Sequence, residues 1–449
     1  MASISTIPTN PTGSLRERCS QCSATGEQLF LCSGCRAVRF CGRAHQTSNW
    51  PEHKALCHRI KRERAKVAKE EDLVRNATDD FMTPANAFET AVGNFWDFYN
   101  TRPYMRARFA LADDLRLTGT LDGAREALVH FRDMLRLCRG DNLGIRDVVP
   151  ALMLRLDLDQ ECYDFVKWWQ THNANGTYDY GDMSQPYLDL HGADALETPD
   201  FFGDFTSLNH IVSLLLLKMK LLIDIRNIKV ARKIPSASRL PTELVLMLEP
   251  NMLRSPLSKT MFQGKTTAQL LEMEAKLVRQ TCLLGGLAVE TNQHFVADLL
   301  DADLALGTEP TPYSKGSWEQ SVTVVKQVYG AFYETEGVLE LLHDARACAA
   351  MESEVEIPDF MKGERRRNPQ NPRTPEEMLK DVSINRIWGY LDYAVENASY
   401  LGTWSERPSV QHYKATLAQL AAYEDEDDED DEADDDEGLD GEYSFSDSE

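Results

Sequence analysis

Eight cysteine and histidine residues lie at short, regular spacings near the start of the chain. They are Cys19, Cys22, Cys32, Cys35, Cys41, His45, His53 and Cys57. Thiolate and imidazole groups are the ligands that zinc takes in structural sites, where four of them complete its tetrahedral coordination. Eight ligands predict two zinc ions with no open coordination position. This pattern indicates structural rather than catalytic metal sites.

The spacing indicates how the chain could bring these side chains together. Each Cys-x2-Cys pair places two thiolates on one tight turn. The pairs Cys41/His45 and His53/Cys57 are four residues apart, which puts both side chains of a pair on one face of a helix. The spacing alone allows sequential or interleaved sharing of the ions. Because the segment is too short for a substantial core, zinc would supply much of its folding free energy, about 10–16 kcal/mol per ion in zinc-finger peptides.

The segment resembles a MYND zinc finger. In that family the two Cys-x2-Cys pairs are followed by an aromatic residue and Cys, then Cys-Gln, a Trp and His-x3-Cys. Here the matching residues occur in the same order: Phe40–Cys41, Gln46, Trp50 and His53–Cys57. His45 stands where the family usually has Cys. Histidine also binds zinc, so we expect binding to survive, although that ion becomes easier to lose in acid.

The resemblance implies an interleaved arrangement of the ligands and a function. One zinc ion would be held by Cys19, Cys22, Cys41 and His45, and the other by Cys32, Cys35, His53 and Cys57. MYND fingers typically bind proline-containing peptides of partner proteins, often transcriptional corepressors, and Gln46 and Trp50 match positions that contact such peptides. An extended proline-rich strand is already ordered and docks on aromatic surface at low entropic cost. The alternative is that Trp50 only packs the finger.

The negative charge of the chain is concentrated at its C-terminal end. The formal net charge is −24; residues 424–449 hold 17 acidic residues and no Lys or Arg, while the remainder holds 48 basic and 55 acidic residues. Such a tail cannot bury a core and is predicted to be disordered. It could keep the protein soluble and monomeric, or engage a basic partner such as histones. The overall charge argues against direct binding of nucleic acid.

The sequence favours a protein of the cytoplasm or nucleus that does not enter a membrane. Residues 1–14 are small and polar, without the basic start and apolar run of a signal peptide, and are predicted to be disordered. The longest apolar stretch, residues 211–225, contains Lys218, Lys220 and Asp224. It is too short and too charged to span a bilayer. The four cysteines outside the finger lie singly in apolar contexts, as small core residues do.

Helical spacing of apolar residues dominates the rest of the chain and predicts a mainly α-helical fold. Over residues 87–99 this spacing predicts a helix. The stretch 105–142 indicates a helix, a short turn at 119–123 and a second helix, and another pair follows at 143–156 and 160–169. These hairpins resemble tetratricopeptide (TPR) repeats, because Gly119 to Ala124 match the inter-helix turn. The consensus proline after the second helix is absent, and Pro150 is expected to interrupt a later helix.

The predicted organisation follows the composition of successive segments. It comprises a disordered N-terminus (1–14), a finger (15–58), a charged connecting helix (59–85), a helical domain (86–354) with TPR-like hairpins near 103–170, a linker (355–375), C-terminal helices (376–423) and an acidic tail (424–449). Within the helical domain, residues 171–204 form a long loop rich in Gly, Asp, Tyr and Pro. A loop of that length is usually functional or disordered.

The main enzymatic alternative is a SET–MYND lysine methyltransferase. That family has an Asn-His-Ser-Cys stretch and a cysteine triplet, whereas here Asn209–His210 is followed by Ile211–Val212 and no cysteine triplet lies beyond the finger. Phosphate-binding loops, nucleophile elbows and zinc-protease helices are also absent. We therefore expect an adaptor without enzymatic activity, whose finger binds a peptide and whose helical body offers a second protein-binding surface. The other alternative is a chromatin-associated regulator that uses the acidic tail.

Overall fold

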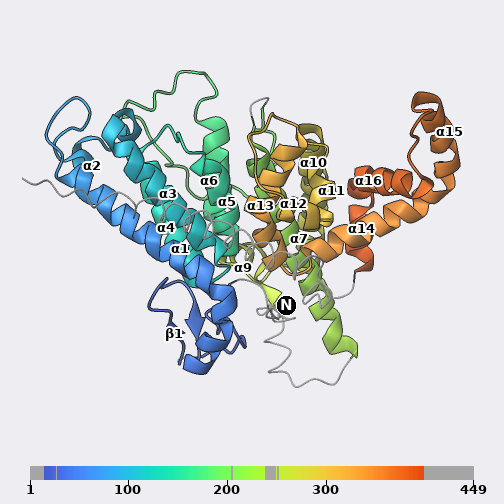
Figure 1. The fold of residues 1–449 in the computed structure, drawn as a ribbon. Helices are drawn as coiled ribbons and strands as arrows, with labels where there is room; N and C mark the ends of the chain where they lie inside the picture. The colour runs from blue at the N-terminus through green and yellow to red at the C-terminus, as the bar shows by residue number, and fades with distance from the viewer. Residues whose placement is uncertain (1–14, 27, 204–205, 238–248, 250–251, 399–449) are drawn as a thin grey trace, which may run out of the picture.

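The computed structural model describes residues 15–26, 28–203, 206–237, 249 and 252–398. It consists of helices apart from one small antiparallel sheet in the finger, where β1 (Phe30–Leu31) pairs with β2 (Arg39–Phe40). Figure 1 shows the finger beneath the first helices and a helical arm at the opposite side. The mainly α-helical class with an N-terminal finger is confirmed. The predictions for residues 1–14, for the helices after 398 and for the acidic tail lie outside the described residues.

The first helix belongs to both the finger and the body. α1 (Arg43–Arg75) starts among the zinc ligands and continues for 33 residues, although it contains Pro51. Its second half packs against α3, and Arg59, Ile60, Glu63 and Val74 are buried there. The connecting helix expected over 59–85 is thus not a separate exposed element. It ends at Arg75, ten residues earlier than expected, and is the direct continuation of the finger helix.

Residues 76–101 connect α1 to α3 without a long helix. The prediction of one helix over 87–99 is wrong. Three short elements form there instead: α2 (Ala87–Thr90) and the 3-10 helices η1 (Phe95–Asp97) and η2 (Tyr99–Thr101). The break falls at Gly93, whose φ of 89° is left-handed. A β-carbon at Gly93 would lie 2.2 Å from the Met183 sulfur, so the end of that side chain would have to move. Tertiary packing overrides the helical spacing here.

Two helix pairs follow, as the sequence predicts. They are α3 (Arg102–Leu117) with α4 (Leu121–Leu137), and α5 (Ile145–Arg155) with α6 (Asp159–Thr171). Gly119 has a φ of 64° in the first turn, and the Thr120 hydroxyl accepts a hydrogen bond from Gly123 N to cap α4. Pro150 lies inside α5 and does not end it, contrary to expectation. Successive helices pack on one another, and α5 also contacts α7 and α13.

The long segment between α6 and α7 is held against α6 by polar contacts. The Asp164 carboxylate accepts hydrogen bonds from Gly192 N and Ala193 N at 2.8 and 2.9 Å, and Trp168 Nε1 donates to Asp189. Around them, Trp168 stacks on His172 with ring centroids 4.1 Å apart. The segment therefore covers the helix rather than standing free. Among the described residues, the groups of ligands close enough to share a metal ion lie in the finger and not in this segment.

The second half of the body is built around one buried helix, α7 (Leu208–Ala237). Of its buried charged residues, Lys220 contacts Asp157 and Asp159, and Asp224 contacts Arg254. Lys218 instead donates hydrogen bonds to Ala195 O and Gln280 Oε1. The α7 helix contacts α9 (Pro256–Phe262), α10 (Thr267–Thr291), α13 (Trp318–Glu334) and α14 (Val338–Ser353). The short helices α11 (Phe295–Leu300) and α12 (Asp303–Gly307) pack against α13. No described helix combines the length and apolar character that a membrane span requires.

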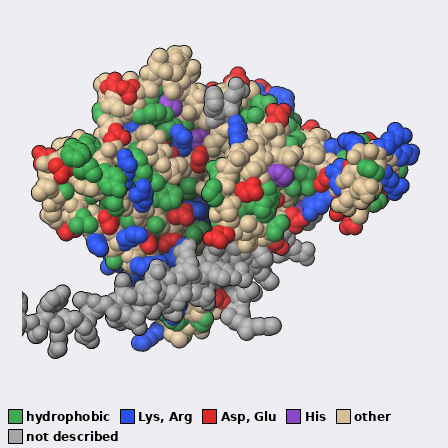
Figure 2. Space-filling view, turned by 45° about the horizontal axis from the view of Figure 1, so that its top comes forward, with side chains coloured by type: hydrophobic (Ala, Val, Ile, Leu, Met, Phe, Trp, Pro, Cys, Tyr) green, Lys and Arg blue, Asp and Glu red, His purple; other side chains and the backbone are tan. Residues whose placement is uncertain are grey.

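The described part of the chain ends in an arm of helices that projects from the body (Figure 1). The region expected to be a linker, 355–375, instead contains η3 (Glu354–Glu356) and α15 (Ile357–Arg367), and α16 (Pro375–Asn397) follows. Ile357 and Met361 are buried against Met378 in a small separate core, and this burial stabilises α15. Figure 2 shows Lys and Arg side chains along the outer rim of this arm.

The contact between α10 and α16 depends on a glycine. A β-carbon at Gly285 would lie 2.2 Å from the Trp388 ring, whereas one at Gly286 meets nothing within 4 Å. We therefore expect Gly285→Ala to lower the free energy of unfolding by about 1–3 kcal/mol through overpacking. Gly286→Ala should raise it by up to about 1 kcal/mol through helix propensity. Urea unfolding of both variants tests this, and equal effects would contradict the close packing.

Candidate metal centre

The finger is formed by two similar turns, the second of which lies between the two strands of the hairpin. In each Cys-x2-Cys turn the amide four residues after the first cysteine donates to that cysteine's carbonyl: Ser23 N to Cys19 O, and Arg36 N to Cys32 O. Ser23 and Arg36 both have left-handed backbones, with φ near 60°, a conformation that non-glycine residues adopt only where the surroundings impose it. Each strand of the hairpin ends at a ligand, because Cys32 follows β1 directly and Cys41 follows β2 directly.

Helix α1 supplies the remaining ligands. His53 and Cys57 lie one turn apart on its buried side, as their spacing predicts. His45 sits in its first turn, but its expected partner Cys41 precedes the helix, which begins at Arg43 after Gly42. Cys41 therefore reaches the site from the end of β2 and not from the face of a helix.

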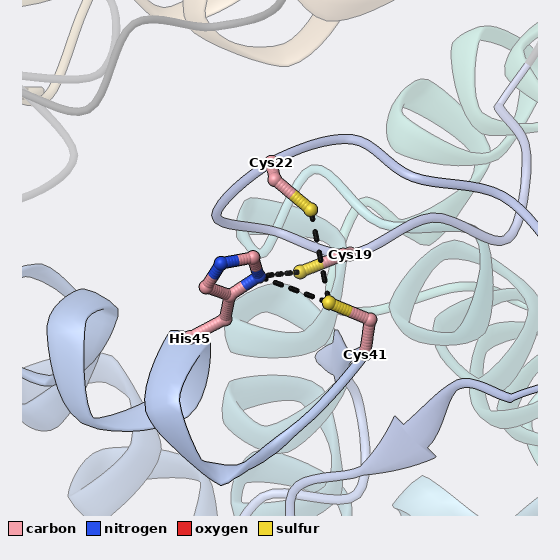
Figure 3. A group of neighbouring side chains, drawn as sticks. All are labelled: Cys19, Cys22, Cys41 and His45. Carbon is pink, nitrogen blue, oxygen red and sulfur yellow. Dashed lines mark hydrogen bonds between the residues drawn. The ribbon is translucent and has the colours of Figure 1, made fainter.

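The first cluster contains Cys19, Cys22, Cys41 and His45, which point toward one another (Figure 3). Cys22 Sγ lies 3.8 Å from Cys41 Sγ. His45 Nδ1 lies 3.7 Å from Cys19 Sγ and 2.9 Å from Cys41 Sγ. The Cys22 thiol is exposed, so this cluster is open to solvent on one side.

The second cluster contains Cys32, Cys35, His53 and Cys57, all of them buried. Cys32 Sγ lies 3.7 Å from Cys57 Sγ. His53 Nε2 lies 3.6 Å from Cys35 Sγ and 3.4 Å from Cys32 Sγ. A tetrahedral zinc ion with zinc–sulfur bonds of about 2.3 Å separates its ligand sulfurs by about 3.8 Å. The side chains thus stand at the separations that one ion requires, and the interleaved pairing is the one the structure forms.

The electrostatics of the clusters also suit a divalent cation. A hydrogen bond with the Cys57 thiol lowers the pKa of Cys35 to about 4, and the same contact raises the pKa of Cys57. Ionisation of one thiol thus disfavours ionisation of its neighbour. The positive charge of a zinc ion offsets this repulsion, and the thiols that coordinate the ion lose their protons. The donor set fits zinc. The finger contains two Cys3His sites that could bind two zinc ions.

The two residues expected to contact a peptide lie on the first turns of α1. The Gln46 side-chain amide is directed at the ligand sulfur of Cys32, with Nε2 3.8 Å from Sγ. Trp50 is 37% exposed and packs its ring edge-on against His53 and His58. Trp50 therefore both supports the finger and presents aromatic surface to solvent. Phe30 and Leu31 of the hairpin are exposed as well.

Contacts between the finger and the body were not foreseen from the sequence. Arg39 forms a two-point ion pair with Asp122 of α4, at 2.6 and 3.0 Å. Arg64 of α1 pairs with Glu126 and also donates to the carbonyl of the zinc ligand Cys35 at 2.9 Å. These partners lie about 60 to 80 residues apart in the chain, so no local pattern could reveal them. Together they fix the finger on α4.

Comparisons with known proteins support the finger. Residues 19–57 match the MYND finger family. Over 79 residues the chain is 32% identical to the Rho GTPase-activating protein gacZ of Dictyostelium discoideum, a match that covers 17% of this chain and 7% of that protein. No solved structure matches the chain. The chain thus contains a MYND finger, and the TPR-like character of its body stays a prediction.

Elemental analysis should find two zinc ions per chain in the purified protein. Replacing His45 with Ala should reduce this to about one, because the open first cluster then keeps only three ligands. His58→Ala is the matched control and should retain both ions, since His58 lies outside the two clusters. A single zinc in the parent would contradict two complete sites.

The contacts between the finger and α4 should contribute measurably to stability. We expect Arg64→Gln to lower the free energy of unfolding by about 1–3 kcal/mol, since it removes charged hydrogen bonds in a half-buried position. It should also speed the loss of zinc to a chelator. Lys276→Gln removes an exposed pair with Glu272 and should change the stability by about 0.5 kcal/mol or less. Equal effects of the two substitutions would mean that Arg64 does not hold the finger.

Proposed function

We propose that the protein is a zinc-binding adaptor whose MYND finger binds a proline-containing segment of a partner protein. The observation that carries this proposal is the position of Trp50. Its ring is held edge-on by the zinc ligand His53, so it is rigid, yet it keeps 37% of its surface exposed. A rigid exposed aromatic is the surface on which an extended proline-rich strand docks at low entropic cost. Gln46, one turn away, would contact the same segment.

We further propose that the helical body offers a second protein-binding surface. The successive pairs α3–α4 and α5–α6 support this, because stacked helical hairpins of the TPR kind present extended surfaces to partners. The finger is fastened to α4, so the two surfaces would have a fixed relative orientation. Since zinc-binding thiols must stay reduced, the cytoplasm or the nucleus is the compartment that suits the protein.

We propose that the protein acts without catalysis. The residues nearest to a methyltransferase signature, Asn209 and His210, are buried in α7. Asn209 donates to Gln327, and the His210 ring lies within hydrogen-bonding distance of Arg146 O and Gln170. Their polar atoms are thus engaged within the core, which supports a structural role. A SET domain is rich in strands, and the described body is helical.

Selection from a random library of proline-containing peptides on the zinc-loaded full chain tests the finger. We expect selected peptides to bind at least about thirtyfold more weakly to Trp50→Ala, because a buried aromatic anchor contributes about 2 kcal/mol or more. Isothermal titration calorimetry measures the difference.

Tyr99→Ala is the matched control for this experiment. Tyr99 is an aromatic residue of the body that is 61% exposed, and its removal should leave binding unchanged. Failure to select any peptide, or equal binding to Trp50→Ala and the parent, would contradict the proposed peptide site.

A further inference from the structure

The outer face of α1 is basic along most of its length. Between residues 50 and 69 the exposed positions contain five Lys or Arg residues and no Asp or Glu. We call these five the basic ridge: Lys54, Lys61, Arg62, Lys66 and Lys69. Trp50, Lys54, His58, Lys61, Ala65 and Lys69 follow one another at intervals of three or four residues. This spacing places them in one stripe on the helix, and the stripe starts at Trp50.

The cations of α1 divide according to the side they face. Toward the body, Arg59 pairs with Asp114 and Arg64 pairs with Glu126. On the ridge, the four lysines form no ion pair with any residue that the structure describes. Arg62 Nε lies 3.7 Å from Glu63 Oε1, and Arg62 has a further contact within the protein. The paired cations hold α1 in place, whereas the ridge lysines make no such contribution.

The one-signed charge of the basic ridge is unfavourable for the isolated helix. Arg62–Lys66 and Lys66–Lys69 lie at four- and three-residue spacing, where like charges repel each other and destabilise a helix by about 0.2–0.5 kcal/mol per pair. Solvated helix faces usually mix charges of both signs, which turns this repulsion into attraction. The described chain has acidic residues in plenty, and Asp72 ends the stripe. The four lysines of the ridge therefore carry charge that is left for a partner to neutralise.

The ridge is continuous with the proposed peptide site. The Trp50 ring packs against His58, the next residue but one of the stripe, with ring centroids 5.7 Å apart. From Trp50 to Lys69 the helix rises about 28 Å, a length that about eight residues of extended peptide span. We propose that the segment bound at Trp50 continues as an acidic run along the basic ridge. This inference rests on the proposed peptide-binding function and adds the chemistry of the partner.

An acidic protein segment fits the ridge better than nucleic acid does. The ridge is one helix wide, and the chain as a whole carries a formal net charge of −24. A long polyanion would extend beyond the ridge and be repelled by the rest of the surface, whereas a short acidic segment stays within a Debye length of the lysines. The partner is thus a protein segment that combines a proline-containing anchor with acidic residues beside it.

The test uses a fluorescein-labelled peptide of eight glutamates and the zinc-loaded full chain. Fluorescence anisotropy at about 50 mM salt should show binding to the parent. Combining Lys54→Gln, Lys61→Gln and Lys69→Gln should weaken that binding at least about tenfold, because several surface charge pairs are lost together. Raising the salt to about 200 mM should weaken binding to the parent as well. All three lysines are exposed, so the variant should keep the parent's circular dichroism and zinc content.

The matched control removes three charges from the arm. Arg365, Arg366 and Arg367 are exposed at the end of α15, and replacing all three with Gln should leave glutamate binding within about twofold of the parent. Equal losses in both triple variants would overturn the proposal, because binding would then follow net charge alone. The Trp50→Ala variant should still bind the glutamate peptide, whereas its binding of the selected proline-containing peptides should be weakened. The two proposals can therefore fail separately.

Two further results would assign the ridge to another ligand. If the parent does not bind the glutamate peptide but a chain ending at residue 423 does, through the same lysines, the protein's own acidic tail occupies the ridge. If a 20-base-pair DNA duplex binds more tightly than the glutamate peptide and loses affinity in the lysine variant, the ridge recognises nucleic acid. Either result overturns an acidic partner segment. Tighter binding of a selected proline-containing peptide after addition of eight glutamates, by about tenfold or more, supports it.

Discussion

The N-terminal half of the molecule depends on the continuity of one helix. α1 supplies His45, His53 and Cys57 to the two clusters at one end and packs against α3 at the other. Although Pro51 lacks one backbone donor, α1 continues as a single helix from Arg43 to Arg75 and so joins the finger directly to the body. The ion pairs of Arg39 and Arg64 with α4 add a second connection. The finger and the helical body therefore have a fixed relative position. A partner protein would meet the finger surface and the body surface in one orientation.

Charged residues have different roles in α1 and α7. In α7, Lys220 and Asp224 are buried in the core and each is neutralised by residues of neighbouring segments. A buried charge without a partner would be strongly destabilising. On the outer face of α1, Lys54 and Lys61 face solvent and need no internal partner to be tolerated. Burial thus determines which charges serve the fold and which remain free to recognise another molecule.

Several segments took structures that local patterns did not indicate. The expected linker at 355–375 folds into α15 because Ile357 and Met361 find Met378 on the following helix. The expected helix at 87–99 is broken because Gly93 adopts a left-handed backbone beside Met183. In both cases the deciding contact comes from outside the segment. Apolar spacing reports which residues seek burial, but it does not report what they will be buried against.

The sequence by itself determined the chemistry of the finger and most helix positions. Ligand types, Cys-x2-Cys turns and caps such as Thr374 are set by residues a few positions apart, so they can be read from the chain. Only the tertiary structure decided that the ligands pair in interleaved order, that Cys41 lies outside the helix and that Asp122 holds the finger. These features depend on segments distant in the sequence that meet only after folding. The exposure of Trp50 beside unpaired lysines belongs to the same class, because packing against α3 selects the face of α1 that solvent sees.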